Sequence, residues 1–129
     1  MNSPNALGIP APLSQPRVYI VEDDPAVSDS MQQLLRMQGF NTVAFDSAEA
    51  FLAALQPGAE GCAIVDIRLP GMDGLELQAL LATRGSALPV IVITGHGDTR
   101  NSRSAFRAGA VDFLEKPIEP DVLLDAVST

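Results

Sequence analysis

The segment CAIVDIRLPGMDGLEL, residues 62–77, decides the fold class because its character changes twice along its length. It begins as an unbroken apolar run containing the carboxylate of Asp66, as expected of a strand buried on both faces of a sheet. The turn-rich RLPGMDG follows, and then a helix is predicted over about residues 75–83. A buried strand, a turn and a helix form the repeating unit of parallel α/β folds.

The same unit recurs along the chain. Strands are predicted at residues 17–22, 40–45, 62–67, 89–94 and 111–114. Helices are predicted at residues 25–38, 75–83, 98–108 and 121–129. A further helix is predicted to begin after Ser47, which would be its N-cap. Five such cycles without a long linker predict an α/β fold: a doubly wound, five-stranded parallel sheet with helices on both faces, of the flavodoxin-like (βα)5 kind.

The first predicted helix shows the local signals most clearly. Pro25 suits a first helical turn, and Gly39 suits the C-terminal stop. Met31 and Met37 are expected in or near the core.

A chain of 129 residues has room for one domain of ordinary size. Residues 1–16 hold four of the ten prolines and no charged side chain, which predicts a disordered, proline-rich tail or a tag remnant. The folded domain is therefore expected to occupy residues 17–129.

Composition narrows the classes of partner. The net charge of −8 argues against direct binding of duplex nucleic acid and favours a cation. The apolar runs are far shorter than the roughly 20 residues that span a bilayer, so no membrane partner is expected. The single cysteine, Cys62, lies in an apolar run and is interpreted as a small core residue, which suits a reducing cytoplasm.

Polar side chains cluster where the predicted strands end, and ligands of open parallel sheets bind beyond these carboxyl ends. The residues concerned are Glu22, Asp23, Asp24, Asp66, Thr94 and Lys116. Crowded carboxylates repel one another, and a raised pKa or a bound cation relieves the repulsion. Oxygen ligands without histidine or cysteine favour magnesium over zinc.

Lys116 is the only lysine, and Thr94 is followed by Gly95, which leaves space beside the hydroxyl. An ammonium group can contact an anion as a compact point charge. Carboxylate, magnesium, hydroxyl and ammonium together are the groups needed to hold a phosphoryl group during transfer.

Four motifs in this order resemble the receiver domain of bacterial two-component response regulators, over about residues 17–127. They are VEDD at residues 21–24, IVDIRLPGMDGLEL at 64–77, VITGHGD at 92–98 and AGAVDFLEKPIEP at 108–120. The sequences GHGD and AGAVDFLEKP are most similar to those of the FixJ-type branch. Full-length members of this branch resemble transcription factors with a C-terminal helix-turn-helix domain. This output domain is expected to be absent from the chain, so DNA would be a partner only through it.

The resemblance implies that Asp66 is the phosphoacceptor for a sensor histidine kinase. It implies that Asp23 binds Mg²⁺ directly, that Glu22 acts through water, and that Asp66 and the backbone carbonyl of Arg68 are further ligands. Mn²⁺ is expected to substitute for Mg²⁺.

A conformational switch is also implied by the resemblance. Thr94 would move toward the phosphoryl group, and Lys116 would contact it. Phe113 would turn inward as Thr94 moves away, by packing alone, since it has no hydroxyl group. Lys116 and Pro117 would be joined by a cis peptide bond. The switch would alter the face of the fourth helix, fifth strand and fifth helix, including parts of residues 102–113, through which the domain would form a homodimer or control an output domain.

Two alternative roles exist for each of three further residues: Asp24, Asp73 and His96. Asp24 is expected either to cap a helix or to contribute to the metal site, and Asp73 to form a turn before a helix rather than to bind a ligand. His96 and Arg68 are hypothesised to control the access of water to the acyl phosphate; the alternative for His96 is a solvated loop residue.

Three alternative functions differ from this one in the residues that they require. A phosphorylation-independent binding module would keep the fold without the switch, but the full set of strand-end residues argues against it. A hydrolase with an aspartyl nucleophile would need a second aspartate where Arg68 stands. A nucleotide-binding Rossmann domain would need Gly-x-Gly-x-x-Gly after the first strand. We therefore expect a signalling domain, not an enzyme with an external substrate, whose only chemistry is phosphoryl transfer to, and hydrolysis at, Asp66.

Overall fold

A computed structural model of the chain describes residues 17–95 and 109–128. The elements, in chain order, are β1 (Arg17–Val21), α1 (Pro25–Met37), β2 (Asn41–Phe45), α2 (Ala48–Ala54), β3 (Gly61–Asp66), α3 (Gly74–Thr83), β4 (Val90–Thr94), β5 (Asp112–Glu115) and α5 (Pro120–Ser128). The tail expected at residues 1–16 and the helix expected at residues 98–108 lie outside the described residues.

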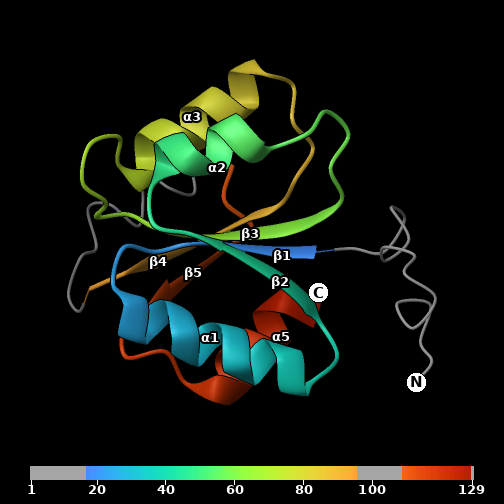
Figure 1. The fold of residues 1–129 in the computed structure, drawn as a ribbon, viewed down its shortest axis with the longest axis vertical. Helices are drawn as coiled ribbons and strands as arrows, with labels where there is room; N and C mark the ends of the chain where they lie inside the picture. Colours follow the sequence, from blue (N-terminus) through green and yellow to red (C-terminus); the bar gives the residue numbers. More distant parts are fainter. Residues whose placement is uncertain (1–16, 96–108, 129) are drawn as a thin grey trace.

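The five strands form one parallel sheet in the order β2-β1-β3-β4-β5. Helices α2 and α3 cover one face, and α1 and α5 cover the other (Figure 1). This arrangement confirms the predicted doubly wound α/β fold. The strand order reverses between β1 and β3, which is where such sheets open a crevice for ligands.

Each face of the sheet has its own apolar layer. Under α2 and α3, Phe51 packs edge-on against Phe45 and tilted against Tyr19, with ring centroids 5.5 and 5.6 Å apart. Under α1 and α5, the buried side chains include Ile20 and Leu35. Every residue of β4 is buried, which explains why the central strands read as unbroken apolar runs.

Short polar side chains begin the helices as predicted. Asp24 is the N-cap of α1 and accepts a 2.9 Å hydrogen bond from the backbone N–H of Ala26, and Pro25 occupies the first turn. Ser47 caps α2 by accepting from the N–H of Ala50 at 3.1 Å. Gly39, just past the end of α1, has φ 91°, a left-handed conformation that favours glycine.

Asp73 caps α3, which confirms its structural reading. Its carboxylate accepts from the N–H of Glu76 at 2.8 Å, and the Glu76 carboxylate accepts from the N–H of Asp73 at 3.0 Å. This reciprocal pair is a capping box.

Some boundaries and one core assignment differ from the sequence prediction. β3 begins and ends one residue earlier than predicted, β5 one residue later, and α5 begins at Pro120. Met31 is buried, but the prediction for Met37 was wrong because this side chain is 73% exposed. It lies about 120° around the helix from Met31, away from the apolar stripe. Cys62 is half-buried and packs against the layer under α1 and α5.

Within the described residues, no helix combines the length and the apolar character needed to cross a membrane.

Candidate functional site

The parallel strands bring the predicted polar residues to one edge of the sheet. Glu22 directly follows β1, Asp66 ends β3, Thr94 ends β4 and Lys116 directly follows β5. The pairing of Asp66 with Ile93, and of Thr94 with Glu115, sets these strand ends level with one another. The edge predicted from the sequence is therefore the edge that the structure forms.

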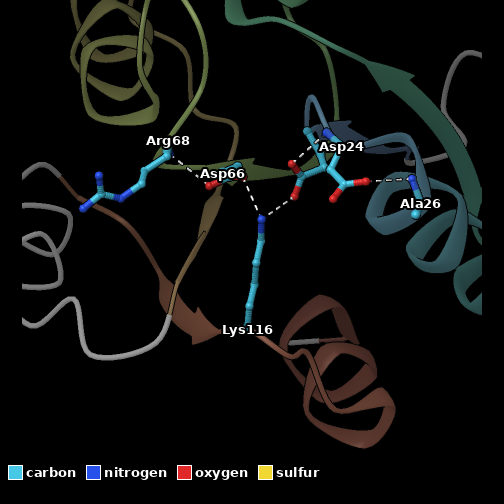
Figure 2. A network of polar contacts seen from close by, with 6 residues as sticks. Asp24, Ala26, Asp66, Arg68 and Lys116 are labelled. Carbon is cyan, nitrogen blue, oxygen red and sulfur yellow. Dashed lines mark hydrogen bonds and ion pairs between the residues drawn. The ribbon is translucent and has the colours of Figure 1, made fainter.

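Lys116 joins two acidic residues of this edge. Its Nζ atom donates a 2.9 Å hydrogen bond to Oδ2 of Asp66 and forms an ion pair with Oε1 of Glu22, also at 2.9 Å (Figure 2). Both carboxylates are buried, whereas the Lys116 side chain is 28% exposed. The partly exposed ammonium group thus contacts both buried carboxylates and partly neutralises the negative charge of Glu22 and Asp66.

Burial and charge shift the pKa values of this group in defined directions. Desolvation raises the pKa of Glu22 from 4.5 to about 7, and the neighbouring Asp66 adds to the rise, although the contact with Lys116 opposes it. Burial alone would lower the pKa of Lys116, but its contacts with Asp66 and Glu22 together outweigh burial and raise the pKa. The ammonium therefore stays charged at neutral pH.

The Asp66 side chain is held at both oxygens. Oδ1 accepts a 3.0 Å hydrogen bond from the backbone N–H of Arg68, and Oδ2 accepts from Lys116. Behind it, Gly74 packs so closely that an added Cβ would collide with the carbonyl oxygen of Asp66 and lie 2.8 Å from Cα of Ile67. The lysine is itself fixed, because its backbone N–H donates to the carbonyl of Thr94 at 2.7 Å.

Glu22, Asp23 and Asp66 form a cluster that could hold a metal ion. Each offers a carboxylate oxygen, and these three oxygens all lie within 4.8 Å of one another. Glu22 and Asp66 are buried and Asp23 is exposed, so an ion would enter from the solvent side. An all-carboxylate set fits a hard cation such as Mg²⁺, with the exposed side left for water ligands.

The two readings of Asp24 are separated by its contacts. Its carboxylate caps α1, and its backbone N–H donates to Oε2 of Glu22 at 3.2 Å (Figure 2). Asp24 therefore acts as the helix cap, and Asp23 provides the exposed acidic side chain of the cluster.

The other predicted site residues are placed as follows. The Thr94 side chain is fully buried at the sheet edge, and Phe113 on β5 is half-buried against the layer under α2 and α3. The Lys116–Pro117 peptide bond is cis, as predicted. The Arg68 side chain is exposed and extends away from Lys116 (Figure 2). His96 lies outside the described residues, so its proposed partnership with Arg68 stays a prediction.

Glu49 belongs to none of the motifs recognised in the sequence. In the structure, Oε2 of Glu49 accepts a 3.0 Å hydrogen bond from the backbone N–H of Met72, in the loop that follows Asp66. The two residues are 23 positions apart and lie in different elements, so no local pattern indicated the contact.

Comparison with known proteins finds close relatives over most of the chain. A family model described as the response regulator receiver domain matches residues 18–128. The transcriptional regulatory protein FixJ of Bradyrhizobium diazoefficiens is 45% identical over 106 residues, which cover 82% of this chain and 52% of FixJ. Nodulation protein W of the same organism is 44% identical over 110 residues, covering 85% of this chain and 48% of that protein.

Among solved structures, the crystal structure of FixJ-N superposes with a TM-score of 0.83 at 42% identity, covering 88% of this chain and 90% of that one. The chain spans about half the length of the curated relatives described above.

Proposed function

The chain belongs to the response regulator receiver domain family, with FixJ among its relatives, and on this premise we propose that Asp66 accepts a phosphoryl group from a sensor histidine kinase. The observation that carries the proposal is the 2.9 Å contact between Nζ of Lys116 and Oδ2 of Asp66. It gives a buried carboxylate a cationic partner at the atom where a phosphoryl group would add new negative charge.

The proposed chemistry is an in-line transfer. A bond forms between a carboxylate oxygen of Asp66 and phosphorus as the nitrogen–phosphorus bond of a phosphohistidine breaks. Lys116 then contacts a phosphoryl oxygen and balances part of its charge. Arg68 N–H keeps Oδ1 of Asp66 oriented during the approach.

Glu22, Asp23 and Asp66 would hold Mg²⁺, or Mn²⁺ in its place, with the backbone carbonyl of Arg68 as a further ligand. Such an ion supplies positive charge that offsets the charge on the transferring phosphoryl oxygens.

Phosphorylation would be converted into a change of surface. The aspartyl phosphate adds up to two negative charges and new acceptors, which draw Thr94 and Lys116 toward it. Phe113 would then occupy the space that Thr94 leaves. We propose that the face altered includes β5 and α5, and that it forms a homodimer or contacts an output domain that binds DNA.

Two exposed apolar side chains lie on or beside these elements. Val111, beside β5, is 59% exposed, and Val122, on α5, is 48% exposed. Burial of such side chains against a partner would be favourable.

The signalling role also implies a cytoplasmic location and chemistry confined to the domain's own Asp66.

The experiment is intact-mass analysis after incubation with a small-molecule phosphodonor. We expect the wild type to gain one phosphoryl group only when Mg²⁺ is present, and Asp66→Ala to gain none. Glu60→Ala, which removes an exposed acidic residue at the opposite end of β3 from Asp66, serves as the control and is expected to behave as the wild type. No gain by the wild type would favour the alternative, a phosphorylation-independent binding module.

A further inference from the structure

The loop between β3 and α3, residues 67–73, directly follows Asp66 and contains Arg68. Part of its conformation is fixed from within, because the N–H of Gly74 donates to the carbonyl of Ile67 at 2.9 Å and Asp73 forms the capping box of α3. These contacts join residues that are neighbours in sequence. They do not by themselves tie the loop to the rest of the sheet edge.

Glu49 provides a contact to this loop from a different helix. It lies in the first turn of α2, after the Ser47 cap, and its Oε2 accepts from the N–H of Met72 at 3.0 Å. The bond from Met72 lowers the pKa of Glu49, so the carboxylate is charged at neutral pH. Hydrogen bonds to a charged acceptor are stronger than those between neutral groups.

Gly71 shows how closely the loop backbone lies under this carboxylate. A Cβ added at Gly71 would lie 2.7 Å from Oε2 of Glu49, and the residue has φ +74°, a left-handed conformation that favours glycine. The peptide that joins Gly71 to Met72 thus lies directly against the Glu49 carboxylate.

The start of α2 is also tied to the other acidic segment of the site. The carbonyl of Phe45, at the end of β2, accepts from the backbone N–H of Glu22 at 3.0 Å. The short stretch from Phe45 to Glu49 therefore contacts the backbone of the segment that carries Glu22 and the backbone of the loop that follows Asp66.

We propose that Glu49 is a positioning residue for the phosphoryl-transfer site: its carboxylate holds the Gly71–Met72 peptide and so keeps Asp66 and Arg68 in place relative to Glu22 and Asp23. The inference rests on the proposed function. Glu49 acts through the loop, and its contribution should appear as metal affinity and transfer rate more than as stability.

The test measures Mg²⁺ binding by calorimetric titration and, separately, the Mg²⁺ dependence of phosphorylation by the small-molecule donor. Glu49→Ala removes the acceptor, whereas Glu49→Gln keeps an oxygen for the Met72 N–H and removes only the charge. Glu60→Ala removes an exposed acidic residue at the opposite end of β3 from Asp66 and serves as the control.

We expect Glu49→Ala to weaken Mg²⁺ binding at least about threefold, below the roughly 10- to 100-fold typical of groups that contact a metal ligand directly. Saturating Mg²⁺ should restore full phosphorylation of this variant. Glu49→Gln and Glu60→Ala should stay within about twofold of the wild type, since the first keeps the hydrogen bond and the second lies at the far end of β3 from the loop.

Gly71→Ala approaches the same contact from the loop side. It disturbs the contact and also strains the loop backbone at φ +74°, so it should weaken Mg²⁺ binding at least as much as Glu49→Ala does. Wild-type Mg²⁺ affinity in Gly71→Ala would contradict the proposal.

Wild-type Mg²⁺ affinity in Glu49→Ala would overturn the proposal, as would an equal loss in Glu49→Ala and Glu49→Gln, which would assign the effect to charge alone. If the wild-type protein binds Mg²⁺ but accepts no phosphoryl group, the proposed function fails, whereas the binding arm still decides whether Glu49 positions the acidic cluster.

Discussion

The Nζ atom of Lys116 lies 2.9 Å from Oδ2 of Asp66, although 50 positions separate the two residues in the chain. The same atom lies 2.9 Å from Oε1 of Glu22. One ammonium group therefore stands between two buried carboxylates that would otherwise repel each other. This arrangement links the stability of the domain to its capacity to accept new negative charge at Asp66.

Replacing Lys116 with methionine should lower both stability and phosphorylation. The substitution leaves Glu22 and Asp66 buried without their shared cation, and breaking a buried ion pair costs about 3–5 kcal/mol. Because the lysine side chain is 28% exposed, we expect a smaller loss, about 1–3 kcal/mol, in the free energy of unfolding of the metal-free protein.

Denaturant unfolding with and without Mg²⁺ measures this effect. Lys116→Arg keeps the charge and is the matched control, expected to retain most of the stability. Equal stability of Lys116→Met and the wild type in metal-free buffer would contradict the role assigned to the ion pair.

The raised pKa of Glu22 predicts that the metal-free protein loses stability as the pH rises from about 4.5 to 7. In this window the folded protein holds a proton on Glu22 that the unfolded chain releases, so the folded state is favoured at the acidic end and loses this advantage as the pH rises. Lys116 stays charged throughout because its pKa is raised.

The Glu22→Gln variant isolates this contribution, because other titrating groups are common to both proteins. The difference in unfolding free energy between the wild type and the variant should change by about 1–3 kcal/mol between pH 5 and pH 7.5 in the presence of a chelator. Mg²⁺ should reduce the change. Parallel stability profiles across this range would be evidence against a perturbed Glu22.

Asp23 and Asp24 are adjacent carboxylates with different predicted phenotypes. Asp24→Ala removes the cap of α1 and should cost about 0.5–2 kcal/mol of stability with little effect on Mg²⁺ affinity. Asp23→Ala removes an exposed member of the acidic cluster and should weaken Mg²⁺ binding at least about tenfold while leaving metal-free stability nearly unchanged.

Thermal unfolding and Mg²⁺ titration of both variants provide the comparison. Loss of Mg²⁺ affinity in Asp24→Ala, together with loss of stability in Asp23→Ala, would contradict the roles assigned to these two residues.

The sheet edge could be predicted from the sequence because it follows from topology. Once the strands are parallel, residues that end them must meet at one edge, and Glu22, Asp66, Thr94 and Lys116 all end or follow strands. Local signals were equally readable, since a cap such as Asp73 acts on its own helix three residues away.

Contacts between elements could not be predicted in this way. Which carboxylates Lys116 reaches, and that Glu49 meets the N–H of Met72, depend on how helices pack on the sheet. The wrong prediction for Met37 has a different origin: its angular position follows from the sequence and puts it in solvent, but its apolar character was given more weight.

The most direct test of Asp66 as the phosphoacceptor is to identify the residue that is phosphorylated. After treatment with the phosphodonor and Mg²⁺, borohydride reduces an acyl phosphate to an alcohol, which marks the modified side chain permanently for peptide mass mapping. The account predicts a single mark, at Asp66, which disappears when Mg²⁺ is chelated. A mark at Asp23 or Glu22, or no mark on a protein that is folded and binds Mg²⁺, would contradict it.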